Sequence, residues 1–79
     1  MKAKVHITLK NGVLDPQGQA IESALDHLGF NGVSARVGKL IELEVKETNT
    51  EKARAAIEQM CEKLLANTVI EKYHVELVA

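Results

Sequence analysis

An internal repeat constrains the fold of this chain more than any other feature of its sequence. Residues of the second half are of the same kind as residues of the first half at an offset of 36 positions. The matched positions are 5 and 41, 7 and 43, 9 and 45, 10 and 46, 21 and 57, 28 and 64, 31 and 67, and 33 and 69. Two similar β-α-β units predict a pseudo-two-fold, ferredoxin-like α+β sandwich, in which two helices cover one face of an antiparallel sheet.

Hydrophobic spacing places the elements of these units in the order β-α-β-β-α-β. Alternating apolar residues predict strands, and apolar residues three or four apart predict helices. The predicted elements are a strand at 2–10, a helix at 16–28, strands at 33–37 and 40–46, a second helix that begins at Thr48–Glu51 and ends near Asn67, and a strand at 69–78. Gly38 and Lys39 are expected to form a type II′ turn between the two middle strands, because that turn favours glycine first.

The polar sides of the strands are expected to form the open face of the sheet. The first strand presents Lys2 and Lys4 there, and the strand at 40–46 presents Glu42 and Glu44. In ferredoxin-like order these two strands are neighbours, so cross-strand Lys–Glu pairs are predicted. This mixed surface suits contact with another protein; the alternative is a solvated face.

The length and the single cysteine limit how this fold is stabilised. Seventy-nine residues form one domain, residues 1–79, whose core is small. Cys61 has no partner for an intrachain disulfide, and no cysteine and histidine spacing typical of zinc sites is present. Self-association that covers sheet edges or the polar face, or docking onto a partner, is therefore the expected additional source of stability.

The charge and composition argue against several classes of partner. The net charge is −1, and Phe30 and Tyr73 are the only Phe, Tyr or Trp residues. A nearly neutral chain with so few stacking side chains does not favour nucleic acid. No apolar run is long enough for a membrane helix, and the lone thiol indicates a reducing compartment. We therefore expect a cytoplasmic protein that binds neither nucleic acid nor membranes.

The segment from Leu9 to Gly18 is predicted to turn from the first strand into the first helix. Asp15 suits the N-cap, and Pro16 suits the first helical position. Gly18 has no such explanation, because glycine within a helix costs about 1 kcal/mol relative to alanine. The corresponding second corner, Val45 to Thr50, contains neither glycine nor proline. The first corner is therefore interpreted as a contact site, where glycine allows another backbone to approach closely.

Three candidate chemical sites have simpler structural explanations. Cys61 lies on the apolar stripe of the second helix, which indicates a buried thiol rather than a nucleophile. His6 and His74 are expected to be neighbours across strands, but a metal site would need a third ligand. The corner lacks phosphate-loop glycine spacing, and Asp15 puts negative charge where an anion would bind. The sequence therefore predicts no catalytic residue and no metal site.

Several of these segments resemble the PurS family. The most specific is the run from Leu9 to Gly18, which reads Leu-Lys-x-Gly-Val-Leu-Asp-Pro-Gln-Gly. Weaker matches lie at 24–30, at Val37–Lys39 and at Cys61–Tyr73, so the resemblance covers nearly the whole chain. Thr68 is a departure, because the family usually has proline there, and the turn into the last strand is expected to be looser.

The resemblance implies a function that the residues alone do not give. PurS is the small subunit of phosphoribosylformylglycinamidine (FGAM) synthase, which acts in de novo purine biosynthesis. Its members form dimers or tetramers and bridge the large subunit, PurL, and the glutaminase subunit, PurQ, supporting ammonia transfer between them. ATP, magnesium and glutamine are used by those partners, so this chain is expected to bind no cofactor. The residues alone leave open an alternative function, a small-molecule-sensing regulatory domain.

One surface is predicted to contact a larger subunit. It combines the first corner with two basic residues of the predicted hairpin. The residues are Lys10, Gly12, Asp15, Pro16, Gln17, Gly18, Arg36 and Lys39. The glycines would let the partner backbone approach, and the basic side chains would form charge pairs. The alternative is a well-capped helix start beside solvated charges.

Overall fold

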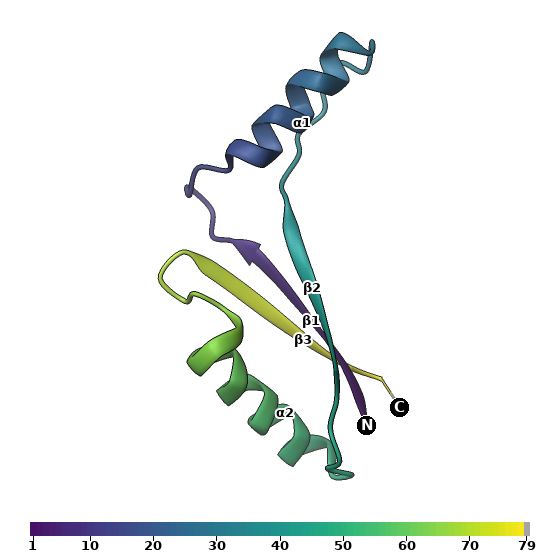
Figure 1. Cartoon of the computed structure of the whole chain (residues 1–79), viewed down its shortest axis with the longest axis vertical. Coiled ribbons are helices and arrows are strands. Elements are labelled where there is room, and N and C mark those ends of the chain that lie inside the picture. The colour runs from purple at the N-terminus through teal and green to yellow at the C-terminus, as the bar shows by residue number, and fades with distance from the viewer. Residues whose placement is uncertain (79) are drawn as a thin grey trace.

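One three-stranded antiparallel sheet is the centre of the structure, a computed structural model that describes residues 1–78. The elements in chain order are β1 (Lys2–Leu9), α1 (Pro16–His27), β2 (Gly38–Glu44), α2 (Thr50–Met60), the π-helical turn η1 (Cys61–Leu65) and β3 (Glu71–Val78). β1 is the central strand, and both β2 and β3 pair with it in antiparallel register (Figure 1). The predicted α+β class with an antiparallel sheet is confirmed.

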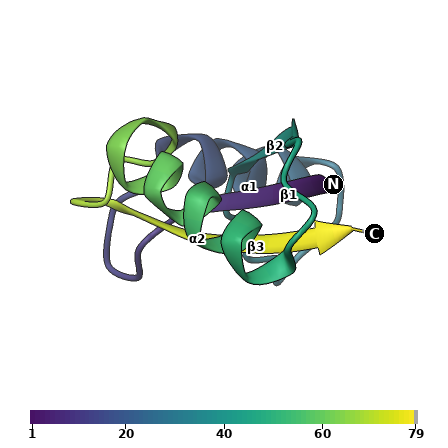
Figure 2. The same ribbon diagram turned by 90° about the horizontal axis from the view of Figure 1, so that it is seen from below.

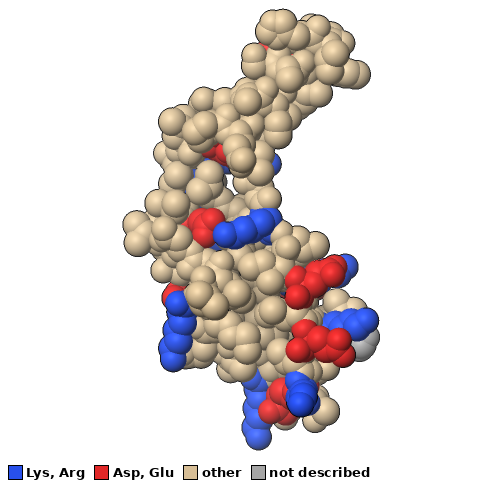
Figure 3. Space-filling model, in the orientation of Figure 1, with Lys and Arg blue, Asp and Glu red and all other residues tan. Residues whose placement is uncertain are grey.

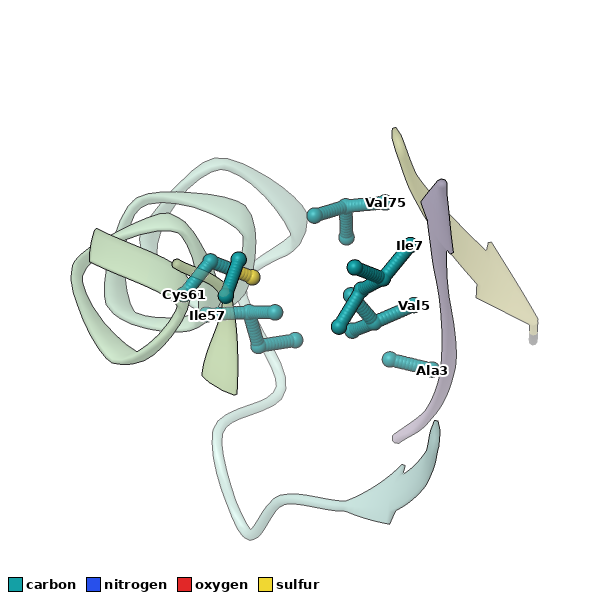
Figure 4. Close-up of a cluster of buried hydrophobic side chains, with 7 residues drawn as sticks. Ala3, Val5, Ile7, Ile57, Cys61 and Val75 are labelled. Atoms are coloured by element: carbon teal, nitrogen blue, oxygen red, sulfur yellow. The ribbon is translucent and has the colours of Figure 1, made fainter. Parts of the chain in front are cut away.

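The hydrophobic core lies between one face of the sheet and α2. β1 alternates so that Ala3, Val5 and Ile7 are buried on the side of α2. Ile57 of α2 and Cys61 of η1 point towards them, and a valine of β3 completes the cluster (Figure 4). Because burial of an aliphatic side chain contributes about 1.5–3 kcal/mol, this layer is the main source of stability within the single chain.

Ile57→Val is expected to lower the free energy of unfolding by about 1 kcal/mol, because it removes one buried methylene and leaves a small cavity. Ile57 is fully buried, whereas Ile70 is 39% exposed. Ile70→Val is therefore the matched control, with an expected change within about 0.5 kcal/mol. Urea unfolding followed by far-UV circular dichroism measures both, and equal effects would contradict this description of the core.

The position of α1 contradicts the sequence-based prediction. Within residues 1–78, α1 makes no extended contact with any strand or with α2, and it projects beyond the end of the sheet (Figure 1). The expectation that two helices cover one face of the sheet is therefore wrong for this chain. The radius of gyration is 15.9 Å, whereas a compact domain of this length has about 11.6 Å. We call α1 together with the returning segment 28–35 the arm.

The middle of the chain also differs from the prediction. The segment 33–37 forms no strand, and β2 runs without a turn through Gly38 and Lys39. The N–H groups of Ala35 and Val37 donate instead to carboxylates of α1 and of its N-cap. Side-chain carboxylates therefore accept the two hydrogen bonds that a neighbouring strand would otherwise accept.

The end of the second helical region widens into a π turn. The N–H of Ala66 donates to the carbonyl oxygen of Cys61, five residues earlier. This wider turn rotates the residues that follow relative to an α-helix. Leu64 is consequently 83% exposed, although helical spacing predicts it on the buried stripe. Met60, which precedes this turn and belongs to the same predicted stripe, is 40% exposed. The helical region ends at Leu65, close to the predicted end.

The open face of the sheet carries the polar residues that alternation predicts there. Lys4 lies opposite Glu42 of β2 and opposite Glu76 of β3, so the predicted pairing of lysines with glutamates across strands is confirmed in the register. His6 lies opposite His74, with ring centroids 6.0 Å apart. β1 begins beside the end of β3, so Lys2 and Val78 lie at the same end of the sheet (Figure 2).

Candidate functional site at the corner between β1 and α1

One buried carboxylate organises the corner between β1 and α1. Asp15 is the N-cap of α1, and Pro16 follows it at the start of the helix, as predicted. Asp15 is only 5% exposed. Its Oδ1 accepts a hydrogen bond from the Gly18 N–H at 2.9 Å, and its Oδ2 accepts one from the Val37 N–H at 2.8 Å. A single side chain therefore binds both the outgoing helix and the returning chain.

Arg36 completes the corner from the returning chain. Its guanidinium donates to the carbonyl oxygen of Val13 at 3.0 Å and to that of Lys10 at 3.2 Å. Its Nε lies 4.0 Å from Oδ2 of Asp15, so charge attraction is added to the hydrogen bonds. The sequence-based hypothesis treats Arg36 as a docking charge, but these donors are already engaged within the chain.

Gly18 is required for a contact inside the chain. It is buried, and a Cβ atom built on it would lie 2.5 Å from the carbonyl oxygen of Ala35 and 2.9 Å from Oδ2 of Asp15. The returning segment of this same chain therefore makes the close backbone approach that glycine predicts. Gly18 and Asp15 are buried in the single chain, so they support the corner from beneath, and their contact with a partner stays a prediction.

Other residues of the predicted surface are exposed around this buried centre. Lys10, Gly12, Pro16 and Gln17 lie along the outgoing chain and are exposed. Gly12 has a φ of 86°, a conformation that glycine adopts without strain. A hollow of about 330 Å³ lies between the outgoing and returning chains, and Gly12 and Arg36 line it. The corner therefore offers a firmly held and accessible rim.

Lys39 lies near this rim but on β2. Its Nζ is 3.7 Å from Oε2 of Glu71, so its charge is partly satisfied within the sheet. Lys39 and Gln17 both line a second hollow, of about 220 Å³, beside the corner. The structure thus brings Lys39 to the predicted surface, from a strand rather than from a turn.

The contacts of Asp15 change how the domain responds to acid. The Val37 N–H, the Gly18 N–H and the Arg36 charge hold the pKa of Asp15 below its ordinary value of 3.8, although burial acts in the opposite direction. As the pH falls, the unfolded state takes up a proton before the folded state does. The stabilisation by Asp15 is therefore complete above the unfolded-state pKa, and it is lost as the pH falls through the lower folded-state pKa.

We expect Asp15→Asn to make stability less dependent on pH between about pH 5 and pH 2. The urea midpoint of the wild-type chain should fall more steeply over this range, because only the wild-type chain must protonate a carboxylate that the fold holds ionised. Asp26→Asn changes an exposed acid on α1 and is the control. Parallel acid profiles for Asp15→Asn and the wild-type chain would contradict the assignment.

The arm exposes large apolar side chains that the sequence predicts to be buried. Ile21 and Leu28 belong to the predicted helical stripe, yet they are 44% and 72% exposed. Phe30 and Val33 follow on the returning segment and are 59% and 42% exposed. We call these four residues the apolar arm surface. On the face shown in Figure 3, the end of the arm is almost bare of charged side chains.

Cys61 and the two histidines of the sheet lie where the sequence predicts them. Cys61 is fully buried, and burial raises the pKa of its thiol, which confirms the prediction of a buried thiol. His6 and His74 are neighbours, as predicted. Residues 1–78 contain no group of three His, Cys, Asp or Glu side chains that could hold a metal ion. No helix in the described part of the chain is long and apolar enough to cross a membrane.

Comparison with known proteins decides the family. A model of the family described as PurS, phosphoribosylformylglycinamidine (FGAM) synthase, matches residues 2–79. This chain belongs to the PurS family. The resemblance that the Leu9–Gly18 run indicates is thereby confirmed, and this corner is a feature of a PurS chain.

Curated and solved relatives agree with the PurS assignment. The PurS subunit of FGAM synthase from Bacillus subtilis is 46% identical over 77 residues, which cover 96% of this chain and 90% of that protein. A crystal structure of Bacillus subtilis PurS superposes with a TM-score of 0.85 at 46% identity, covering 99% of this chain and 98% of that chain. A chain of the PurLQS structure from Thermotoga maritima has a TM-score of 0.88 at 37% identity, covering 98% and 95%.

Proposed function

We propose that this chain, a small subunit of FGAM synthase by family, bridges the large subunit, PurL, and the glutaminase subunit, PurQ. The observation that carries the proposal is the PurS match across residues 2–79. A chain of the PurLQS structure from Thermotoga maritima, with a TM-score of 0.88 to this chain, supports the partnership. The chain holds the two partners together in the cytoplasm, so that ammonia released from glutamine reaches the large subunit.

The chemistry of the reaction belongs to the partners in this proposal. ATP and magnesium act on the large subunit, glutamine is hydrolysed on the glutaminase subunit, and this chain binds no cofactor. Its own contribution is a surface of fixed shape. Lys10, Gly12 and Gln17 at the exposed rim of the corner contact the larger subunit, because the hydrogen bonds beneath them hold the rim in one conformation.

We assign the apolar arm surface to a second copy of this chain. The chain exposes 5824 Å², whereas a compact monomer of 8.7 kDa exposes about 4,700 Å². The excess of about 1,100 Å² is close to the roughly 800 Å² that each partner buries in a standard protein interface. An arm that buries this surface against another copy would give the chain the packing that its own sheet does not provide.

The chemistry of the arm favours a second copy over a transient partner. Interfaces between permanently associated copies are more apolar than transient ones, and the four residues of the apolar arm surface carry no charge. A two-fold axis would bury both arms in one self-complementary contact. The proposed assembly is therefore a homodimer, or a tetramer built from two such dimers.

Reconstitution tests the bridging role. The purified chain is mixed with PurL, PurQ, magnesium, ADP and glutamine, and the mixture is separated by size exclusion. We expect one complex that contains all three chains, and a gain in glutamine-dependent FGAM formation. Ammonium chloride in place of glutamine should support FGAM formation with or without this chain. Separate elution, with no gain in glutamine-dependent rate, would refute the proposal.

A variant at the rim of the corner tests the assigned surface. Gln17→Arg places a larger, charged side chain on the exposed rim and is expected to lower the affinity for PurL by about tenfold, seen as a loss of co-elution. Ser23→Arg adds the same side chain further along α1, on the side away from Ile21, and is the matched control. Equal effects of the two substitutions would show that the corner rim is not the contact surface.

A further inference from the structure

Polar side chains join the two chain segments that connect the arm to the sheet. Within the described chain, α1 makes no extended contact with any strand or with α2, so no extended apolar layer of the single chain determines its angle. The outgoing passage, residues 10–15, leads from β1 into the arm, and the returning passage, residues 36–37, leads from the arm into β2 (Figure 1). Hydrogen bonds of Asp15 and Arg36 and the ion pair between these two residues join the passages. We propose that Asp15 and Arg36 form a polar joint that fixes the direction in which the arm leaves the sheet.

The two side chains of the joint bind the two passages reciprocally. Asp15 belongs to the outgoing passage and accepts from the Val37 N–H of the returning passage at 2.8 Å. Arg36 belongs to the returning passage and donates to the carbonyl oxygens of Val13 and Lys10 of the outgoing passage. Each passage therefore supplies a side chain that binds the backbone of the other, and rotation of the arm about either passage would break a hydrogen bond.

The chemistry of these contacts suits an orienting role. Hydrogen bonds weaken steeply away from their preferred angle, whereas the hydrophobic effect is non-directional. Bonds to an ionised group are shorter and stronger than neutral ones. Asp15 is the one charged residue buried in the described structure, and Gly18 lets the Ala35 carbonyl oxygen come close beside it. Loss of either charged side chain would therefore leave the direction of the arm poorly defined.

The joint lies apart from the hydrophobic core, so the direction of the arm does not depend on the contacts that hold the sheet and α2 together. The buried cluster consists of residues of β1, α2, η1 and β3 together with Ala66, and it includes no residue of the arm. A change at the joint is thus expected to let the arm swing while the sheet and α2 remain folded. If the arm binds a second copy, two copies can associate only when the joint holds each arm in the required direction. This consequence rests on the proposed function, whereas the joint itself does not.

Distances between two spin labels measure the direction of the arm. Ser23→Cys on α1 and Glu76→Cys on β3 provide exposed attachment sites, and the natural Cys61 is fully buried. Labelled chain is diluted with unlabelled chain, so that only distances within one copy contribute. The wild-type joint should give one narrow distance distribution, whereas Asp15→Ala and Arg36→Ala should each broaden it about twofold or more. Asp26→Ala, at an exposed acid of α1, is the matched control and should leave it narrow.

Far-UV circular dichroism and thermal unfolding show whether each variant remains folded. Arg36→Ala alters an exposed side chain, so it keeps the test decisive where Asp15→Ala fails to fold. The proposal of a joint would be overturned by a narrow distance distribution in Arg36→Ala or in a folded Asp15→Ala. Equal broadening of the distribution by Asp26→Ala would overturn it as well. Light scattering separates the two proposals: a swinging arm with an unchanged oligomer supports the joint and contradicts its role in assembly.

Discussion

The double variant Ile21→Lys and Leu28→Lys is expected to dissociate the homo-oligomer, with a rise of about 100-fold or more in the dissociation constant, or about 3 kcal/mol. Both side chains belong to the apolar arm surface and are exposed in the single chain, at 44% and 72%. In the proposed dimer they are buried, and a lysine placed there would lose its water without gaining a partner. The isolated chain should tolerate the same lysines, because they face solvent.

Sedimentation equilibrium over a range of concentrations measures this effect. Ser23→Lys adds a lysine to α1 on the side away from Ile21 and is the matched control, with an expected dissociation constant close to that of the wild-type chain. The wild-type chain and the control should also show a melting temperature that rises with concentration, and the double variant should not. A double variant with the wild-type mass at every concentration would refute the assignment of the arm to a second copy.

Local patterns predicted most of the elements of this chain. Alternation identified β1 and β3, helical spacing identified α1 and α2, and the N-cap at Asp15 followed from its side chain and from the proline after it. These features depend on residues close in sequence, so a single sequence contains the information. The same holds for the facing pair His6 and His74, because alternation fixes the face on which each residue lies.

The position of α1 depends on contacts that local patterns do not contain. Its stripe, with Ile21 and Leu28, has the same spacing as the stripe of α2 with Ile57. Periodicity shows that a helix has an apolar side, but not whether that side meets its own sheet or another copy. The repeat therefore predicted two equivalent helices, although only α2 packs on the sheet in the described residues.

The corner shows the same limit at the level of single hydrogen bonds. The sequence indicated that Gly18 is needed for a close backbone approach, and that requirement is real. It could not show that the approaching group is Ala35, because 17 positions separate the two residues along the chain. The alternation of 33–37 was misleading for a related reason, since the acceptors for its N–H groups are the distant carboxylates of Asp15 and Glu22.

Gly18→Ala is expected to destabilise α1 by about 2 to 3 kcal/mol, because a Cβ atom would lie 2.5 Å from the carbonyl oxygen of Ala35. The sign of this effect separates two explanations of the glycine. Helix propensity alone predicts that alanine stabilises the helix by about 1 kcal/mol relative to glycine. Because the nearest obstacle is backbone rather than the end of a flexible side chain, the returning chain would have to move, and the Asp15 hydrogen bonds with it.

Amide hydrogen exchange along α1 measures this effect, since it reports the free energy of local opening of the arm. Ser23→Ala, at an exposed position of the same helix, is the matched control and should slow exchange slightly, as propensity predicts. Exchange in the buried strand β1 should change less than exchange in α1 when Gly18 is replaced, because the core lies apart from the corner. Slower exchange of α1 in Gly18→Ala would mean that Ala35 can yield, and that the glycine serves some purpose other than this contact.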